Sequence, residues 1–238
     1  MANILIIGAS RGLGAAFSVG IPTPGDTVWL VSRSRPDLER SDGVSRRWVE
    51  VDLASEDASR KVAQALAGQL LDVLIYNAGI WEQHAFTPDY DFEQVSEIET
   101  RNIISVNLTS AITCVQSVLP NLRQSASGKI ILIGSTSGLD NNGSPEVAYA
   151  ASKYGLRGFD QALRENLRRD AIAVTCINAG EVAADIAYER GAEEAIAMYG
   201  GTRIPVQDFV AIVRCLMSLS NVACVKEIDV PAITDRNA

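Results

Sequence analysis

Histidine and cysteine are scarce in this sequence of 238 residues, and the few that occur do not cluster. The one histidine, His84, has no ligand pattern around it, so we expect no metal site and interpret His84 as a loop or pocket-wall residue. The cysteines form no C-x-x-C pair and lie far apart within apolar segments, which predicts reduced core residues rather than disulfides. They are Cys114, Cys176, Cys215 and Cys224.

Positive charge is in deficit, because 21 Lys and Arg residues face 29 Asp and Glu residues, for a formal net charge of -8. Sequence-independent binding to nucleic acid relies on clustered Lys and Arg, so this class of partner is excluded, and anionic membrane surfaces are disfavoured likewise. No apolar stretch reaches the ~20 residues that span a bilayer, and the chain starts directly with a strand-like run rather than a signal peptide. We expect a cytoplasmic protein with no membrane partner.

Short apolar runs alternate with helical patterns along the chain. About seven runs are strand-like, and several are apolar almost throughout, as expected for strands that helices cover on both faces. They read NILII, TVWLVS, RWVEV, DVLIY, KIILIG, IAVTCIN and CVKEIDV. Helices are predicted over 55–68, with Ser55 available as a cap, over 102–122 and over 148–169, whereas residues 34–45 favour a loop. The alternation predicts an α/β fold: one Rossmann-like domain over 1–238 with a doubly wound parallel sheet and helices on both faces.

Three glycines, Gly8, Gly12 and Gly14, follow the first predicted strand within the stretch GASRGLG. Such a loop lets backbone N–H groups and a helix N-terminus approach a pyrophosphate. The spacing is G-x-x-x-G-x-G rather than the general dinucleotide fingerprint G-x-G-x-x-G. Taken alone, the stretch fits both a cofactor loop and a tight turn between a strand and a helix.

Further motifs follow in order along the chain. YNAG at 76–79 follows the fourth strand, Asn107 lies in the long helix, Ser135 lies in GSTSG after the fifth strand, and YAASK at 149–153 opens the next helix. Together with the glycine turn, this set resembles the short-chain dehydrogenase/reductase family over nearly the whole chain. The resemblance implies an oxidoreductase that uses a nicotinamide cofactor. The catalytic group that it implies is Asn107, Ser135, Tyr149 and Lys153.

Tyr149 and Lys153 are four residues apart, so on a helix both side chains project from one face. A phenol has an ordinary pKa near ~10, and a nearby ammonium favours the phenolate, so we expect Lys153 to lower the pKa of Tyr149. The resemblance implies that Lys153 also holds the nicotinamide ribose, that Ser135 binds the substrate oxygen, and that Asn107 supports a water path. Each of these side chains also has a purely structural interpretation, as a helix or turn residue.

The charge after the second strand bears on the choice of cofactor. An acidic residue there favours NAD, whereas arginine accepts the 2′-phosphate of NADP. Arg33 follows Ser32 at this point and Arg11 lies in the glycine loop, which favours NADP(H) over NAD(H); the alternative is that Arg33 and Arg35 are solvated loop charges. By resemblance Asp52 contacts adenine, although it is equally suited to shaping its own turn. The full set of expected cofactor-binding residues is Gly8, Ser10, Arg11, Gly12, Leu13, Gly14, Ser32, Arg33, Asp52, Leu53, Asn77, Ala78, Gly79, Tyr149, Lys153, Ala179, Gly180 and Val182.

Several positions depart from the family pattern. Ile7 stands where a threonine is usual, so we expect the glycine turn to lack one hydrogen bond, and Ala179 and Ala184 replace a proline and a threonine. One extra residue separates the serine motif from the tyrosine motif. We place it in the loop LDNNGSPEVA, and the alternative register makes Thr136 the hydroxyl donor.

These observations predict an NADP(H)-dependent oxidoreductase that interconverts a carbonyl and a secondary alcohol on a small molecule, with Tyr149 as general acid or base. We expect Trp81, Leu139, Glu181 and a mobile flap over 185–201 to line the substrate pocket. The apolar helices predict a homodimer or homotetramer. The alternatives are a non-catalytic dinucleotide-binding sensor or scaffold on the same fold, and an epimerase or dehydratase of the same family.

Overall fold

The computed structural model describes residues 1–140 and 143–235 and contains a sheet of seven parallel strands. The strands are β1 (Asn3–Ile7), β2 (Thr27–Ser32), β3 (Ser45–Glu50), β4 (Val73–Tyr76), β5 (Lys129–Ile133), β6 (Ala173–Ala179) and β7 (Glu227–Val230). Their order across the sheet is β3-β2-β1-β4-β5-β6-β7. Successive strands are therefore added toward one edge from β1 to β3 and toward the other edge from β4 to β7. The predicted doubly wound parallel sheet is confirmed, and its switch point lies where ligands bind in such folds.

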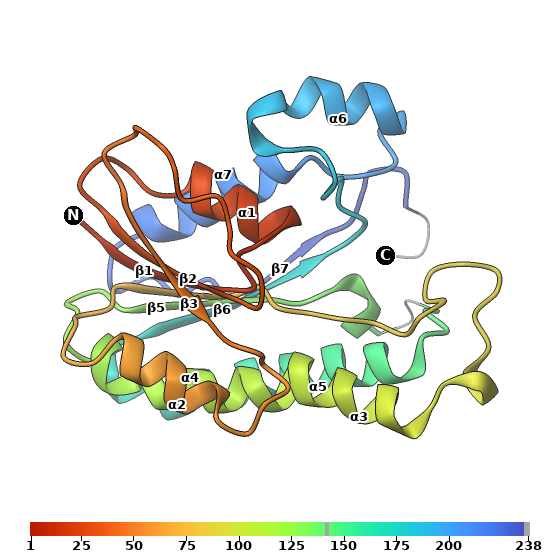
Figure 1. Cartoon of the computed structure of the whole chain (residues 1–238), viewed down its shortest axis with the longest axis horizontal. Helices are drawn as coiled ribbons and strands as arrows, with labels where there is room; N and C mark the ends of the chain where they lie inside the picture. Colours follow the sequence, from red (N-terminus) through yellow and green to blue (C-terminus); the bar gives the residue numbers. More distant parts are fainter. Residues whose placement is uncertain (141–142, 236–238) are drawn as a thin grey trace.

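Helices cover both faces of the sheet (Figure 1). One face carries α1 (Gly12–Gly20) and α7 (Val206–Ser218), with α6 (Ala192–Tyr199) above them. The other face carries α2 (Ala58–Ala65), α3 (Glu97–Ile104), α4 (Ser110–Leu122) and α5 (Val147–Asn166). A π-helical turn, η2 (Ser105–Thr109), joins α3 to α4, and short 3-10 turns are η1 (Phe92–Gln94), η3 (Thr136–Gly138), η4 (Arg168–Asp170) and η5 (Tyr188–Arg190).

Each face of the sheet has its own apolar core. Along β1, Leu5 and Ile7 belong to the core beneath α2 and α4, whereas Ile4 and Ile6 belong to the core beneath α1 and α7. Side chains alternate between the two faces of a strand, so a strand covered on both sides needs apolar residues at every position. This packing explains why runs such as NILII and KIILIG do not alternate with polar residues.

The predicted strands and the helices predicted over 55–68 and 148–169 hold to within three residues, whereas the helix predicted over 102–122 begins earlier, at Glu97. The cap predicted for α2 is wrong. Asp57 occupies the N-cap position, and neither residue caps the helix with its side chain, because the Ser55 hydroxyl donates to the Asp57 carboxylate instead (2.5 Å). The Ser55 carbonyl accepts from the N–H of Ala58. The segment between β2 and β3 has no helix or strand, as predicted.

The interpretation of the cysteines holds for two of the four. All four are free, and Cys114 and Cys176 are buried, but Cys215 and Cys224 are exposed. Cys215 lies on the solvent-facing side of α7, whose buried residues occupy the opposite side, and Cys224 lies in the loop before β7. Apolar neighbours in the sequence therefore did not mean a buried position in the fold.

The expectation that no apolar segment is long enough to span a membrane is wrong for one helix. Together α3, η2 and α4 form a continuous helix, Glu97–Leu122, which could cross a membrane by its length and composition alone. Of the residues in its most apolar stretch, 44% are buried inside the protein. Its residues Val106, Val115 and Val118 belong to the core on one face of the sheet. Packing against the sheet accounts for these apolar positions.

Candidate active site

The glycine loop between β1 and α1 is shaped by close backbone approach. Gly8 has a φ of +87°, and a Cβ there would lie 2.6 Å from the backbone nitrogen of Ala78. A Cβ on Gly14 would lie 1.9 Å from the carbonyl oxygen of Gly8. Side chains do not fit at these two positions, so the loop closes tightly against the residues that follow β4.

The N-terminus of α1 suits an anion. Its N-cap residue, Arg11, makes no side-chain cap hydrogen bond, and the first turn, which includes Leu13, holds no acidic residue. Arg11 is exposed and Ser10 is half-buried beside it. Backbone N–H groups and the positive end of the helix dipole favour phosphate at such a position. A cradle without Cβ atoms next to this helix end therefore fits the pyrophosphate of a dinucleotide, which Gly8 and residues 10–14 would hold.

Asn77 supports the glycine loop from the end of β4. Its side-chain amide donates to the carbonyl oxygen of Gly8 (2.9 Å), and its backbone N–H donates to that of Ile7 (2.9 Å). Ile7 itself is fully buried and has no side-chain hydrogen-bonding group, so the side-chain support of the turn described here comes from Asn77. The sequence predicts Asn77 on the adenosine side of the cofactor, which stays a prediction, and the structure shows its amide bonded to the loop backbone.

Asn107 ties three elements together from the π-helical turn. Its Oδ1 accepts from the backbone N–H of Ile80 (2.8 Å), and its Nδ2 donates to the carbonyl of Ile80 (2.8 Å) and to the hydroxyl of Ser152 (2.9 Å). The buried Tyr76 hydroxyl donates to the carbonyl of Val106 (2.6 Å), within the same turn. Such turns recur at functional sites because they redirect side chains. Here the turn aims Asn107 at the start of the loop after β4.

Tyr149, Ser135 and Lys153 converge at the carboxyl end of β5. The Tyr149 and Ser135 hydroxyls are hydrogen-bond partners. Lys153 Nζ donates to the carbonyl of Ile133 (3.0 Å) and lies 5.5 Å from the centre of the Tyr149 ring. It is also 3.6 Å from where a Cβ on Gly79 would stand. All three side chains are buried.

The turn η3 determines which hydroxyl faces Tyr149. A Cβ on Gly138 would lie 2.9 Å from the backbone of Lys153, so this glycine lets the turn contact α5 directly. In this geometry Ser135, rather than Thr136, is the partner of the Tyr149 hydroxyl. The extra loop residue was placed in a segment that includes residues 141–142, which lie outside the described residues.

The pKa values at the site depart from the sequence-based expectation. Burial raises the pKa of Tyr149, the carboxylates of Glu146 and Glu82 raise it further, and the hydrogen bond with Ser135 lowers it. Burial also lowers the pKa of Lys153 from 10.5 to about 8. The expectation that the lysine brings the pKa of the phenol down is therefore wrong, because the cost of burying a phenolate is larger. Tyr149 is a neutral phenol near neutral pH and can donate a proton.

The loop that follows β4 caps the helix that carries Tyr149, which the sequence did not reveal. Glu82 is buried, and its Oε1 accepts from the backbone N–H groups of Ala148 (2.8 Å) and Tyr149 (3.2 Å). The hydroxyl of Tyr90 accepts from the N–H of Val147 (3.0 Å). The residue at the N-cap position of α5 makes no side-chain cap. No local motif predicts these bonds, because the capping residues lie about 60 positions earlier in the chain.

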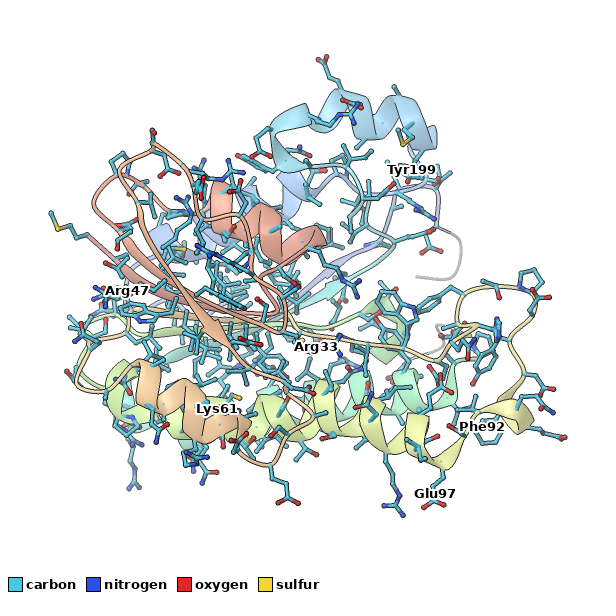
Figure 2. All side chains as sticks on the ribbon, viewed as in Figure 1. Arg33, Arg47, Lys61, Phe92, Glu97 and Tyr199 are labelled. Carbon is cyan, nitrogen blue, oxygen red and sulfur yellow. The ribbon has the colours of Figure 1, made fainter. Side chains whose placement is uncertain are left out.

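The expected adenosine side contains exposed arginines. Arg11, Arg33 and Arg35 are exposed, and no ion pair in the described part of the chain engages them. Figure 2 shows Arg33 near the middle of the molecule, whereas Arg47 lies toward the opposite end from Phe92. Arg33 follows the carboxyl end of β2, next to the glycine loop, where the N–H groups of Gly8 (2.8 Å) and Ala9 (3.2 Å) donate to the carbonyl of Val31.

Ser32, Asp52 and Leu53 serve the local structure here. The Ser32 hydroxyl is buried, donates to the carbonyl of Ser34 (2.7 Å) and accepts from the indole of Trp48 (3.2 Å). Asp52 is exposed and accepts from the N–H of Ala54 (3.0 Å), which is the turn-shaping role left open by the sequence, and Leu53 is buried. The hydroxyl of Ser32 is thus engaged in holding the loop that carries Arg33.

The segment after β6 crosses the glycine loop. Ala179 ends the strand, Gly180 donates to the carbonyl of Val230 (2.9 Å), and Val182 forms a β-bridge with Ile204. The Cβ of Ala184 lies 3.2 Å from where a Cβ on Gly12 would stand. Replacement of the usual threonine by alanine therefore leaves a methyl group over the loop.

The predicted flap over 185–201 is a small structured unit that contains α6. The Tyr199 hydroxyl donates to Asp185, the Arg203 guanidinium lies 4.4 Å from the centre of the Tyr199 ring, and Arg203 pairs with Glu181 (2.8 Å). Glu181 was expected to line the pocket, and this ion pair places it at the base of the flap. Its mobility stays a prediction.

Of the other expected pocket residues, Trp81 lies beside Tyr149, and Leu139 is bonded to Tyr154 on the same helix. Trp81 lies 6.3 Å from the Tyr149 ring, measured between ring centres, and Leu139 accepts from the hydroxyl of Tyr154 (2.6 Å). His84 is exposed in the loop after β4. Within the described residues no group of three His, Cys, Asp or Glu side chains is arranged to hold a metal ion.

Comparison with known proteins identifies the family. A family model described as short chain dehydrogenase matches residues 2–195. The chain belongs to the short-chain dehydrogenase family. A Pseudomonas aeruginosa protein named rhamnolipids biosynthesis 3-oxoacyl-[acyl-carrier-protein] reductase is 32% identical to this short-chain dehydrogenase over an alignment of 191 residues, and the match covers 74% of this chain and 71% of that protein. A very-long-chain 3-oxoacyl-CoA reductase from Laccaria bicolor is 30% identical over an alignment of 230 residues, and the match covers 92% of this chain and 63% of that protein.

Solved structures of the family share the whole fold of this short-chain dehydrogenase. The Pseudomonas aeruginosa RhlG/NADP active-site complex has a TM-score of 0.78 and 25% identity, and the match covers 98% of this chain and 95% of that chain. A Brucella melitensis 3-oxoacyl-[acyl-carrier protein] reductase in complex with NAD has a TM-score of 0.79 and 23% identity, with coverage of 96% and 94%. These matches confirm the fold along nearly its full length.

Proposed function

We propose that this short-chain dehydrogenase uses NADP(H) to interconvert a carbonyl and a secondary alcohol on a small molecule, with Tyr149 as the acid–base group. One observation carries the proposal: the hydrogen-bonded hydroxyls of Tyr149 and Ser135 lie beside the buried ammonium of Lys153. The loops after β4, β5 and β6 place this group near the uncapped N-terminus of α1, where a dinucleotide fits.

The chain's own residues supply binding and proton transfer. Bound NADPH supplies the hydride. A carbonyl oxygen that replaces the Ser135–Tyr149 hydrogen bond would accept from both hydroxyls, so Tyr149 would deliver a proton as the negative charge develops. Because the pKa of Tyr149 is raised, the phenol is protonated before the reaction, which suits the reductive direction. Lys153 is placed to contact the ribose beside Gly79, and Asn107 positions the loop after β4.

The proposed preference for NADP(H) rests on Arg11 and Arg33. Both are exposed and take part in no ion pair of the described residues; Arg11 lies in the glycine loop, and Arg33 follows β2 beside it. Arginine binds phosphate by charge-assisted hydrogen bonds. The residue after β2 is Arg33 rather than an acid that would repel a 2′-phosphate. Structures of this fold have been solved with NADP and with NAD, so the fold alone does not select between the two cofactors. The preference for NADP(H) is therefore proposed from these arginines.

We also propose a cytoplasmic homo-oligomer. All four cysteines are free, which suits a reducing compartment. Ile112 on α4 and Tyr154 on α5 are large apolar side chains exposed on the helices that we expect to pair. Light scattering at micromolar concentration should give a dimer or a tetramer, and a monomer would contradict the pairing.

The direct test of the function measures consumption of NADPH and NADH against a panel of ketones and aldehydes, together with binding titrations of both cofactors. We expect NADPH-dependent reduction of at least one carbonyl compound. Binding of NADPH without turnover across the panel would instead support the sensor interpretation. If neither cofactor binds, the glycine stretch would be interpreted as a tight turn between a strand and a helix.

A further inference from the structure

Two aromatic rings stand beside Tyr149 on the expected substrate side. The ring centres of Phe86 and Tyr149 are 5.4 Å apart, those of Trp81 and Tyr149 are 6.3 Å apart, and those of Trp81 and Phe86 are 5.8 Å apart. All three pairs meet edge to face. Trp81 and Phe86 are 54% and 55% exposed although Tyr149 is buried. We call Trp81 and Phe86 the aromatic wall.

The backbone at Phe86 is strained, and a buried carboxylate holds it. Phe86 has a φ of +63°, in the left-handed region that bulky side chains rarely adopt. Its N–H donates to Oε1 of Glu146 (2.7 Å), and Glu146 is 2% exposed and also accepts from the hydroxyl of Ser144. Strain of this kind persists where the surrounding structure enforces it and is concentrated at functional sites. Glu146, the residue just before α5, therefore sets the ring of Phe86 against Tyr149.

The surroundings of the wall are acidic. Residues 81–99 contain six Asp and Glu residues and no Lys or Arg. Across the site, Arg203 is paired with Glu181 and Arg190 is paired with Glu194. Apart from the buried Lys153, the described segments 81–99 and 181–203 thus contain no Lys or Arg outside an ion pair, in contrast to the exposed arginines on the adenosine side. Phosphate-bearing substrates would meet an unfavourable potential at this entrance.

We propose that the aromatic wall selects an uncharged carbonyl compound with an aryl group directly attached to the carbonyl carbon, and that Glu146 is the positioning residue for Phe86. The inference rests on the proposed carbonyl reduction, since it places the carbonyl oxygen at Tyr149. An aryl group on the carbonyl carbon then falls within reach of Trp81 and Phe86, where edge-to-face contacts add to apolar burial. Thioesters on a phosphopantetheine arm carry a phosphate, so acyl-carrier and CoA substrates are disfavoured, although relatives are named as reductases of such substrates.

The test compares three substrates with NADPH: acetophenone, acetone and acetoacetyl-CoA. Wild-type kcat/KM should be at least about tenfold higher for acetophenone than for either of the others. Phe86→Ala should lower kcat/KM for acetophenone by about 3- to 10-fold, mainly through KM, and should lower the acetone value by a smaller factor. Phe92→Ala is the matched control, because Phe92 lies in the same acidic segment and is 57% exposed, and its ring is not in the aromatic contacts found among the described residues. It should leave all three values unchanged.

Glu146 is tested by rescue. Glu146→Ala should reproduce the rise in KM for acetophenone seen with Phe86→Ala while kcat stays near wild type, and Glu146→Gln, which keeps an oxygen acceptor for the Phe86 N–H, should restore it. An equal effect of Phe92→Ala, or better wild-type activity on acetoacetyl-CoA than on acetophenone, would overturn the proposal and leave carbonyl reduction standing. Reduction of no carbonyl compound at all would overturn both.

Discussion

The ammonium of Lys153 lies 5.5 Å from the centre of the Tyr149 ring, one helical turn along α5, and is buried together with it. The two groups affect each other less than burial affects each of them. Burial moves the pKa of the lysine down to about 8 and the pKa of the tyrosine up. Both shifts favour the uncharged form of the group, so the free protein holds this site at a cost in stability.

Replacing the buried ammonium should therefore stabilise the fold and abolish the activity. Lys153→Met keeps most of the side-chain volume. Removing the buried charge raises the free energy of unfolding at pH 7 by about 1.4 kcal/mol per pKa unit, and losing the bond to Ile133 lowers it. We expect a net rise of about 1–2 kcal/mol. The folded state of the wild type releases its proton near pH 8, whereas the unfolded lysine does so near 10.5. The stability difference should thus shrink as the pH rises from 8 toward 10.5. Urea unfolding at pH 7 and 9.5 measures it, and a less stable variant at pH 7 would contradict this account of burial.

The raised pKa of Tyr149 predicts opposite pH profiles for the two directions of reaction. Reduction needs the protonated phenol, which persists above the ordinary tyrosine pKa of 10.0, so its kcat should show no loss from tyrosine ionisation up to pH 9. Alcohol oxidation needs the phenolate, so its rate should still be rising at pH 10. Initial rates in both directions with saturating cofactor measure this. An oxidation rate that levels off near pH 8 would mean that the phenol ionises far more easily than its burial implies.

Strain at Phe86 predicts a trade between stability and specificity. Phe86→Gly removes the side chain from a position with φ of +63°, where a left-handed conformation costs a bulky residue about 1 kcal/mol, so the variant should unfold at a temperature equal to or above that of the wild type. The same variant should lose activity on acetophenone, because the wall is broken. Thermal unfolding and kcat/KM measured on one preparation test the pair of effects. A clear loss of stability would show that the ring, and not the backbone, dominates the energetics of this residue.

The arginines beside the glycine loop predict cofactor preference. Arg33→Ala and Arg11→Ala should each weaken NADPH binding by about tenfold or more and leave NADH binding nearly unchanged, because charge-assisted hydrogen bonds to the 2′-phosphate contribute about 1.5–3 kcal/mol. Arg35→Ala serves as the control, since Arg35 is equally exposed two residues farther along. Equal wild-type affinities for the two cofactors, or equal effects of all three variants, would mean that these are only surface charges.

Local chemistry made much of the site predictable. Gly8 and Gly14 of the first turn stand where no Cβ fits, and Tyr149 and Lys153 share one face of a helix by their spacing. The continuous apolar runs followed from a sheet covered on both faces. In each case the physical reason lies within a few residues of the motif itself.

The remainder depends on contacts between distant segments. Nothing near Glu82 in the sequence shows that its carboxylate caps a helix that begins at Val147, or that Glu146 holds Phe86 in a strained conformation. The direction of the Tyr149 pKa was misjudged for the same reason, because burial comes from the whole fold whereas the lysine is visible four residues away. The solvent-facing position of Cys215 likewise depends on which side of α7 the core occupies.

The measurement that bears most directly on the proposed chemistry is NADPH-dependent reduction by Tyr149→Phe, compared with wild type on any carbonyl compound that the wild type reduces. The phenylalanine ring keeps the edge-to-face packing with Phe86 and Trp81 and removes only the hydroxyl that contacts Ser135. We predict unchanged NADPH affinity and thermal stability, with kcat lower by at least ~100-fold, the contribution of a positioned acid. A kcat within about threefold of wild type would contradict the role of Tyr149 as proton donor.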